Sequence, residues 1–235
     1  GDKKGARNLM ELLVRSESAK LLAIYLITQK NEGRKTPGMD GKVYLTSKER
    51  MKLSKENFDH TTYKFQPVLR KYIPKGTTNW RLKGLHRRRA NPDKVKLRPL
   101  GMMTIKDRVM ATIISFALTA KWEAILEPNV MGFRPGRNTQ DAMERIYHEL
   151  NGKNRAILDA DLSGFFDNIN HEAILRRLDV FSCVIERCLN AGMIENGKLR
   201  KTTKGVVQGN PLGPVLANIA LHGLQGLFGA FQKDG

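Results

Sequence analysis

Three aspartates stand within one short, largely apolar stretch, residues 157–171, which reads ILDADLSGFFDNINH. Asp159 and Asp161 alternate with apolar side chains, and this period of two predicts a strand whose two faces differ. One face would carry both carboxylates, and the other face only apolar side chains that pack on helices. Carboxylates at the end of a strand suit a hard cation such as Mg²⁺, which takes oxygen ligands and is often shared with substrate phosphates.

A purely structural interpretation of the same residues is open. Asp159 would then face solvent, Asp161 would cap a turn, and Asp167 would cap the helix that follows, because aspartate side chains readily bond nearby backbone N–H groups. Two aspartates separated by one residue are a weak signal on their own. The choice between the two interpretations therefore depends on the rest of the chain.

The net charge of the chain is strongly positive. Its 235 residues include 41 Lys and Arg against 23 Asp and Glu, which gives a net charge of +18. The excess is concentrated, because residues 64–108 contain fourteen Lys and Arg and only two Asp. The polyanion that most often neutralises such a stretch is a phosphate backbone, which indicates a nucleic-acid partner. The alternative is a solvated basic face without a partner.

The composition disfavours several other classes of protein. An apolar content of 40% suits a globular chain, and no apolar run approaches the roughly 18 residues of a membrane span. The N-terminal residues lack the apolar core of a signal peptide. Cys183 and Cys188 are the only cysteines and have no histidine beside them, so neither a disulfide framework nor a zinc site is indicated. We expect a reducing intracellular compartment, either an organelle such as a mitochondrion or a bacterial cytoplasm, and no membrane.

Periodicity predicts mostly helices, together with one β-hairpin. Residues 63–75 are rich in strand-forming side chains, and residues 96–104 are expected to pair with them as a hairpin that closes around a basic insertion, residues 76–95. Helices are expected over residues 8–31, 45–58, 105–127, 139–150, 171–193 and 216–231.

Two of these helices carry the clearest local signals. Thr104 and Asp107 form a capping pair at the start of the helix over residues 105–127. The helix over residues 139–150 spaces four apolar side chains for burial, namely Met143, Ile146, Tyr147 and Leu150. Both helices are therefore expected to pack an apolar side on the core.

Several sequence blocks follow one another along the chain. They are RKTPGMDGK at 34–42, YIPK at 72–75, RPLGMMTIKDR at 98–108, GFRPGR at 132–137, DLSGFFDNINH at 161–171 and GVVQGNPLGPVLANIALHGL at 205–224. This series resembles the reverse transcriptase domain of group II intron-encoded proteins, the maturases, over about four-fifths of the chain. The third, fourth and fifth blocks are each fairly specific, and together they make a chance match improbable.

The resemblance implies a fold and a division of the chain. The fold would be α+β, like that of right-hand polymerases, with fingers and a partial palm and with helices packed on a small, mostly antiparallel sheet. Residues 1–60 would form an N-terminal helical extension, residues 61–152 a fingers-like region with the basic insertion at 76–95, and residues 153–235 the partial palm. The cofactor implied is Mg²⁺ if the chain is catalytic, and none otherwise.

The resemblance also assigns roles to individual residues. Asp161 matches the first metal-binding aspartate of the polymerase palm. Phe166 is similar to the aromatic gate that crowds a ribose 2′-OH and selects deoxynucleotides, and its structural alternative is a buried aromatic. Gln208 and Gly209 match the pair that lies under the nucleotide and the template.

Basic residues receive roles in the same way. Lys75 and Arg98 match the cations of the finger strands that clamp an incoming triphosphate, a role that suits bidentate arginine. Arg134 and Arg137 of the GFRPGR block resemble contacts to template or phosphate, and the alternative for Arg137 is a surface pair with Asp141. Further RNA contacts are expected in the basic insertion, at Lys83, Arg87, Arg88 and Arg89.

The sequence departs from the family pattern at the second metal-binding set. Family members carry a Tyr-x-Asp-Asp tetrapeptide, but no Asp-Asp pair occurs in these 235 residues. The usual Pro-Gln-Gly-Gly is Val-Gln-Gly-Asn at 207–210, the usual Ser-Pro is Gly-Pro at 213–214, and the basic insertion is longer than usual. Two-metal phosphoryl transfer needs carboxylates around ions that lie roughly 3.5–4 Å apart, and a lone aspartate cannot hold both.

We therefore expect an RNA-binding protein derived from a group II intron reverse transcriptase or maturase. It would act in intron splicing or in a ribonucleoprotein such as an organellar ribosome, and these 235 residues alone would not polymerise. The alternative is the N-terminal part of an active RNA-directed DNA polymerase or maturase that uses Mg²⁺ and deoxynucleotides. The expected partners are intron or ribosomal RNA, other ribonucleoprotein subunits, and a separate chain that completes the palm and thumb.

Overall fold

The computed structural model describes residues 2–74, 97–152 and 157–227, and it begins with a group of short helices. These are α1 (Lys3–Arg15), α2 (Glu17–Tyr25), the π-helical turn η1 (Leu26–Lys30), the 3-10 turn η2 (Glu32–Lys35) and α3 (Ser47–Ser54). Side chains cap several of their N-termini. Asp2 accepts a hydrogen bond from the Gly5 N–H, and Thr46 forms a capping box with Glu49. The helices expected over 8–31 and 45–58 are therefore confirmed.

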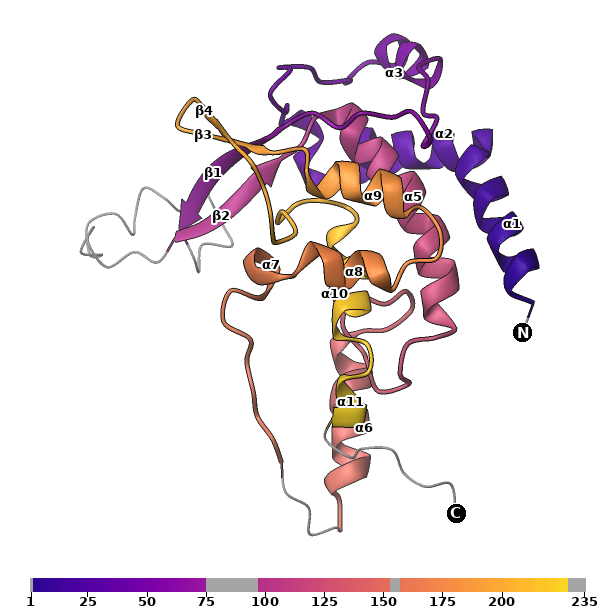
Figure 1. Cartoon of the computed structure of the whole chain (residues 1–235), viewed down its shortest axis with the longest axis vertical. Coiled ribbons are helices and arrows are strands. Elements are labelled where there is room, and N and C mark those ends of the chain that lie inside the picture. Colours follow the sequence, from indigo (N-terminus) through magenta and orange to yellow (C-terminus); the bar gives the residue numbers. More distant parts are fainter. Residues whose placement is uncertain (1, 75–96, 153–156, 228–235) are drawn as a thin grey trace.

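Four short strands form a single mixed sheet. They are β1 (Val68–Pro74), β2 (Leu97–Met102), β3 (Met193–Glu195) and β4 (Lys198–Arg200), in the order β2-β1-β3-β4. The pairs β1/β2 and β3/β4 are antiparallel, whereas β1 and β3 run parallel. The mostly antiparallel sheet and the hairpin of β1 with β2 are thus confirmed (Figure 1). The basic insertion between these two strands lies outside the described residues.

The helix α5 (Ile105–Glu123) forms the centre of the fold. It begins as predicted, because the Thr104 hydroxyl accepts a hydrogen bond from the Asp107 N–H at 3.0 Å. It ends at Glu123, four residues earlier than expected. Side chains all along it are buried, including Ile105, Val109, Met110, Ile113, Ile114, Ala117 and Leu118. The helices α1 and α2 pack against it from one side.

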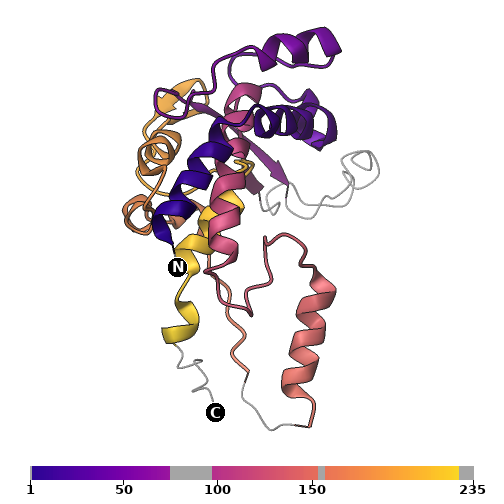
Figure 2. The same cartoon turned by 90° about the vertical axis from the view of Figure 1, so that its right-hand side faces the viewer.

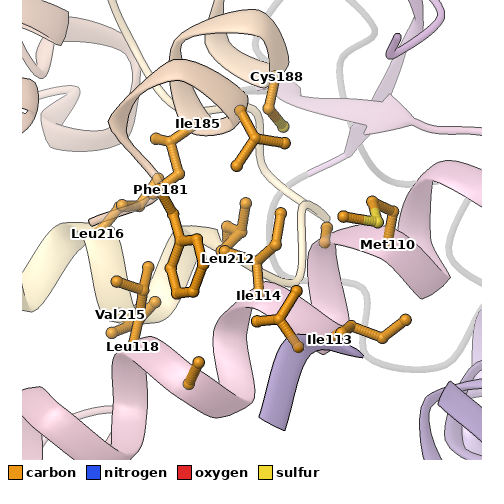
Figure 3. Close-up of a cluster of buried hydrophobic side chains, with 14 of the residues drawn as sticks. Met110, Ile113, Ile114, Leu118, Phe181, Ile185, Cys188, Leu212, Val215 and Leu216 are labelled. Atoms are coloured by element: carbon orange, nitrogen blue, oxygen red, sulfur yellow. The ribbon is translucent and has the colours of Figure 1, made fainter. Parts of the chain in front are cut away.

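The second half of the chain, apart from α6, packs on the remaining side of α5. It contains α6 (Thr139–Leu150), α7 (Phe165–Asn168), α8 (His171–Arg176), α9 (Ser182–Leu189), α10 (Gly213–Leu221) and α11 (Leu224–Leu227). Figure 3 shows Ile114 and Leu118 of α5 meeting Ile185 of α9 and Leu216 of α10 in the main cluster. This one cluster extends from Met10 to Ile219, so the parts expected as three regions share a single core.

Helix α6 corrects one prediction. Its bounds are those expected, but its apolar side chains are not buried: Met143, Ile146 and Tyr147 are 66%, 58% and 62% exposed. The reason is that the helix stands apart from the body of the fold, as Figure 2 shows. A helical period identifies an apolar face, but the presence of a neighbour decides whether that face is buried.

The segment 157–162 corrects another prediction. It was expected to be a strand with an apolar rear face, but it is irregular, and Ile157, Leu158 and Leu162 are 71%, 67% and 55% exposed. Strand-forming side chains produce a strand only where a neighbouring strand takes up the backbone hydrogen bonds. Among the described residues no strand lies beside this segment, so the strand does not form.

Candidate nucleic-acid interface

Residues 205–210, which we call the glycine loop, are hydrogen-bonded to the sheet on one side and to α7 on the other. The Gly101 N–H of β2 donates to the Gln208 carbonyl at 2.9 Å, and the Val206 N–H donates to the Phe166 carbonyl at 2.7 Å. These bonds join three blocks that are distant in the sequence. Gln208, Gly209 and Phe166, which the resemblance placed at one site, therefore lie close together in the fold.

The glycines of this region permit a close approach of backbones. A Cβ on Gly101 would lie 1.8 Å from a Val207 methyl group, so any side chain there would displace the loop. Gly209 has a φ of +102° and its added Cβ would lie 2.9 Å from the Gly101 carbonyl oxygen. Both positions thus need glycine for the loop to dock on β2, independently of any ligand.

A groove of about 320 Å³ lies beside the glycine loop, between β1, β2 and residues 201–207. Three cations line it, Arg70, Lys201 and Lys204, and Asp167 is the one acidic side chain among its described lining residues. Arg70 forms an ion pair with Asp167 at 3.1 Å, and Lys204 donates to the Asn168 side chain at 2.9 Å. The groove is consequently a basic surface that can accept a phosphate.

Sequence reasoning missed the three groove cations. A signal existed for each, because Arg70 belongs to the strand that ends in YIPK, and Lys201 and Lys204 directly precede the glycine loop. Their spacing matches no motif, so only the packing of β1 against residues 201–207 brings them together. By contrast, Arg98 is exposed opposite Ile73. Paired residues share a face of the sheet, and side chains alternate along each strand, so Arg98 and Ile73 lie on the opposite face of the hairpin from Arg70.

Several predicted contacts lie outside the described residues. They are Lys75, Lys83, Arg87, Arg88 and Arg89, all within residues 75–96. The convergence of Lys75 and Arg98 on one triphosphate therefore stays a prediction.

Phe166 lies in a short row of aromatic side chains. Its ring meets Phe165 at a centroid distance of 5.7 Å and Phe133 at 6.2 Å, both nearly edge to face. Phe166 is half-buried, whereas Phe133 is 64% exposed. The structure thus places Phe166 beside the glycine loop as a partly packed aromatic, and its role as an aromatic gate that selects deoxynucleotides stays a prediction.

Asp161 lies in the exposed segment 157–162 and makes no described contact with the other site residues. Among the described residues, no three Asp, Glu, His or Cys side chains gather closely enough to hold a metal ion. The residues present do not fit a two-metal centre, which needs several carboxylates around the ions. The metal-binding role of Asp161 stays a prediction.

Arg134 corrects a predicted RNA contact. Its side chain is 4% exposed, and it donates to both Glu123 carboxylate oxygens and to the backbone carbonyls of Glu123, Glu127 and Val130. These bonds use all five N–H groups of the guanidinium, so none is left for a phosphate. The hydrogen bonds from Arg134 also hold the pKa of Glu123 below its usual value.

Arg137 is half-exposed and remains a candidate for a phosphate contact. Its Nη1 donates to the Pro128 carbonyl at 3.1 Å, and its Nε lies 3.9 Å from Glu123. The alternative pairing with Asp141 is wrong, because Asp141 caps α6 through reciprocal bonds with Asn138 at 2.8 and 2.9 Å. Arginines three residues apart therefore have different environments.

Comparison with known protein families identifies the family of this chain. A family model described as reverse transcriptase (RNA-dependent DNA polymerase) matches residues 73–230, about two thirds of the chain. The chain belongs to the reverse transcriptase family. A second model, described as the N-terminal domain of reverse transcriptase, matches residues 1–56.

Individual relatives narrow the branch of the reverse transcriptase family. The group II intron-encoded protein LtrA of Lactococcus lactis subsp. cremoris is 32% identical over 201 residues, which cover 83% of this chain and 31% of LtrA. The protein YkfC of Escherichia coli K12 is 29% identical over 210 residues, covering 83% of this chain and 51% of YkfC. Maturase-like protein 1 of Euglena gracilis is 26% identical over 231 residues, covering 95% and 46%.

The chain spans between about a third and a half of the length of these relatives. The predicted likeness to group II intron-encoded and maturase-like proteins is confirmed. Among the described helices of this reverse transcriptase family member, none is long and apolar enough to cross a membrane.

Proposed function

We propose that this chain is an RNA-binding module of the group II intron maturase type, which acts in intron splicing or as a component of a ribonucleoprotein. The observation that carries the proposal is the basic groove beside the glycine loop, where three cations face one acid. The groove is bordered by segments of the sequence that the reverse transcriptase model matches, which supports a nucleic acid as its partner. The net charge of +18 supports the same partner.

Electrostatics explains how such a surface would grip RNA. Lys201 and Lys204 are exposed, and they can each neutralise a phosphate and release its condensed counterions. Arg70 already pairs with Asp167, which holds its guanidinium beside the groove. The binding would depend on the backbone more than on base identity. The cations of the basic insertion, residues 76–95, would extend this contact beyond the groove.

The experiment is a titration of a labelled single-stranded RNA with the wild-type chain and with the double variant Lys201→Glu/Lys204→Glu. The variant should bind more weakly, and its plot of log affinity against log salt should lose about 0.7 of slope per lysine, the value for a phosphate on a single strand. The matched control is Lys48→Glu/Lys52→Glu, an equal charge change at two exposed positions of α3 away from the groove. An equal loss in the control and in the groove variants would contradict the proposed site.

A second comparison separates binding from metal chemistry. Reversing Arg87, Arg88 and Arg89 of the basic insertion should weaken RNA binding more than Asp161→Asn does, because three positive charges are lost rather than one carboxylate. The opposite ranking would favour a function centred on a metal at Asp161. We propose that these 235 residues alone do not polymerise, and primer extension with Mg²⁺ and deoxynucleotides tests this directly.

We also propose that a polypeptide completing the palm covers the bare apolar surfaces at 157–162 and on α6. The backbone of 157–162 has no strand partner among the described residues, and Met143, Ile146 and Tyr147 line an uncovered hollow. A β-hairpin of that polypeptide would pair with the backbone of 157–162, and its apolar side chains would cover the exposed face of α6. The relatives contain two to three times as much chain, which is room for such a segment. Adding that segment should slow hydrogen exchange at 157–162, and unchanged exchange would contradict the proposal.

A further inference from the structure

An exposed aromatic with an unusual backbone lies outside the groove: Phe133, in the loop between α5 and α6. Its φ is +60°, in the left-handed region, and its ring is 64% exposed. A bulky residue with this backbone is rare, because its Cβ approaches the following carbonyl oxygen. Gly132 and Gly136 lie in the same loop, so the chain uses glycine nearby but keeps an aromatic at the strained position.

The loop is held in place on both sides of Phe133. The Gly132 carbonyl accepts a hydrogen bond from the Asn218 side chain of α10 at 3.0 Å. Arg134 is anchored by its five-donor network on Glu123 and the neighbouring carbonyls. Because these bonds hold both neighbours, the backbone at residue 133 is kept in the left-handed conformation, and its side chain is largely exposed. Strain that the surroundings impose in this way is typical of binding sites.

Core packing does not explain the aromatic ring. Phe133 does not belong to the buried cluster, and among the described residues its one aromatic contact is the edge-to-face approach to Phe166 at 6.2 Å and 89°. That contact connects it to the candidate interface, because Phe166 borders the glycine loop. Most of the ring surface remains open to solvent. An exposed aromatic with a half-exposed arginine in the same loop, here Arg137, is an arrangement with which proteins stack the bases of single strands.

We infer that Phe133 is a stacking platform for one unpaired base of a bound RNA strand, a site that rests on the proposed RNA-binding function. Arg137, four residues further along the loop, is half-exposed, and its Nη2 makes no hydrogen bond with any described residue. It can therefore take the phosphate next to that base. Stacking on an aromatic face tolerates any base, so the platform selects single-stranded RNA over duplex without reading sequence.

The decisive variant is Phe133→Gly. Glycine tolerates the left-handed conformation, so this change should leave the melting temperature equal or higher. It removes the ring, so affinity for a single-stranded RNA should fall by roughly tenfold or more. Affinity for a duplex RNA of equal length should stay unchanged, because its bases are already stacked. Phe133→Trp should restore single-strand binding.

Tyr147→Ala is the matched control, since Tyr147 is an equally exposed aromatic on α6, outside the groove. It should leave RNA affinity unchanged. The inference is overturned if Phe133→Gly binds single-stranded RNA like the wild type, if single-strand and duplex affinities fall together, or if the loss of affinity follows a loss of stability. A wild-type chain that binds no RNA would overturn the proposed function and this inference together, so the two failures are distinguishable.

Discussion

Replacing Arg134 with lysine should destabilise the fold strongly although it preserves the charge. The guanidinium reaches Glu123 and two further backbone carbonyls, of Glu127 and Val130, with a planar fork of donors. A lysine ammonium is a compact point charge with three donors and cannot make this set of bonds. A buried carbonyl left without a partner costs about 1–3 kcal/mol. Weakening the pair with the partly exposed Glu123 adds about 1 kcal/mol at most.

We therefore expect Arg134→Lys to lower the free energy of unfolding by about 3 kcal/mol. In a chain of 235 residues, each 1 kcal/mol moves the melting temperature by roughly 2–4 °C, so the shift should be roughly 6–12 °C. Arg137→Lys is the control, because Arg137 is half-exposed and lies 3.9 Å from Glu123, and it should cost less than about 1 kcal/mol. The assay is thermal and urea unfolding of both variants. The reasoning is refuted if Arg134→Lys unfolds like the wild type and loses RNA affinity instead.

Three further predictions concern Glu123, Gly101 and residues 157–162. Because the hydrogen bonds from Arg134 lower the pKa of Glu123 in the folded protein, this pair stabilises the fold at pH values above the usual pKa of 4.5, and the stabilisation is lost as the pH falls through the lower folded pKa. Glu123→Gln should therefore reduce the loss of stability at acid pH, and an unchanged loss would argue against the pair. Gly101→Ala should detach the glycine loop, since the new methyl would lie 1.8 Å from a Val207 methyl group. The backbone amide at position 101, which donates to the Gln208 carbonyl in the wild type, should then lose its protection from hydrogen exchange, and retained protection would contradict the prediction. Amides of 157–162 should exchange at rates near those of an unstructured chain, and slow exchange would reveal an unrecognised partner.

Local signals in the sequence predicted the elements well. The cap at Thr104 located the start of α5, and the apolar period with its flanking signals gave the bounds of α6 at Thr139–Leu150. The hairpin of β1 with β2 followed from the strand-forming side chains on either side of the insertion. These features depend on residues within a few positions of one another, which is why a single sequence contains them.

Features that depend on distant neighbours could not be predicted. Whether the face of α6 is buried and whether 157–162 forms a strand are both decided by what packs beside them. Arg134 and Arg137 stand in one motif, and contacts across the loop to Glu123 and the nearby carbonyls determine which one is committed to the fold. The groove cation Arg70 becomes visible only when β1 lies against residues 201–207.

The affinity of the wild-type chain for single-stranded RNA, measured as a function of salt concentration, tests the proposed function most directly. Each phosphate neutralised on a single strand contributes a slope of about −0.7 in log affinity against log salt. Lys201 and Lys204, the two groove cations that do not pair with Asp167, therefore predict a slope of about −1.4 or steeper, and the basic insertion should add to it. An affinity that does not change with salt would contradict a function based on gripping the RNA backbone.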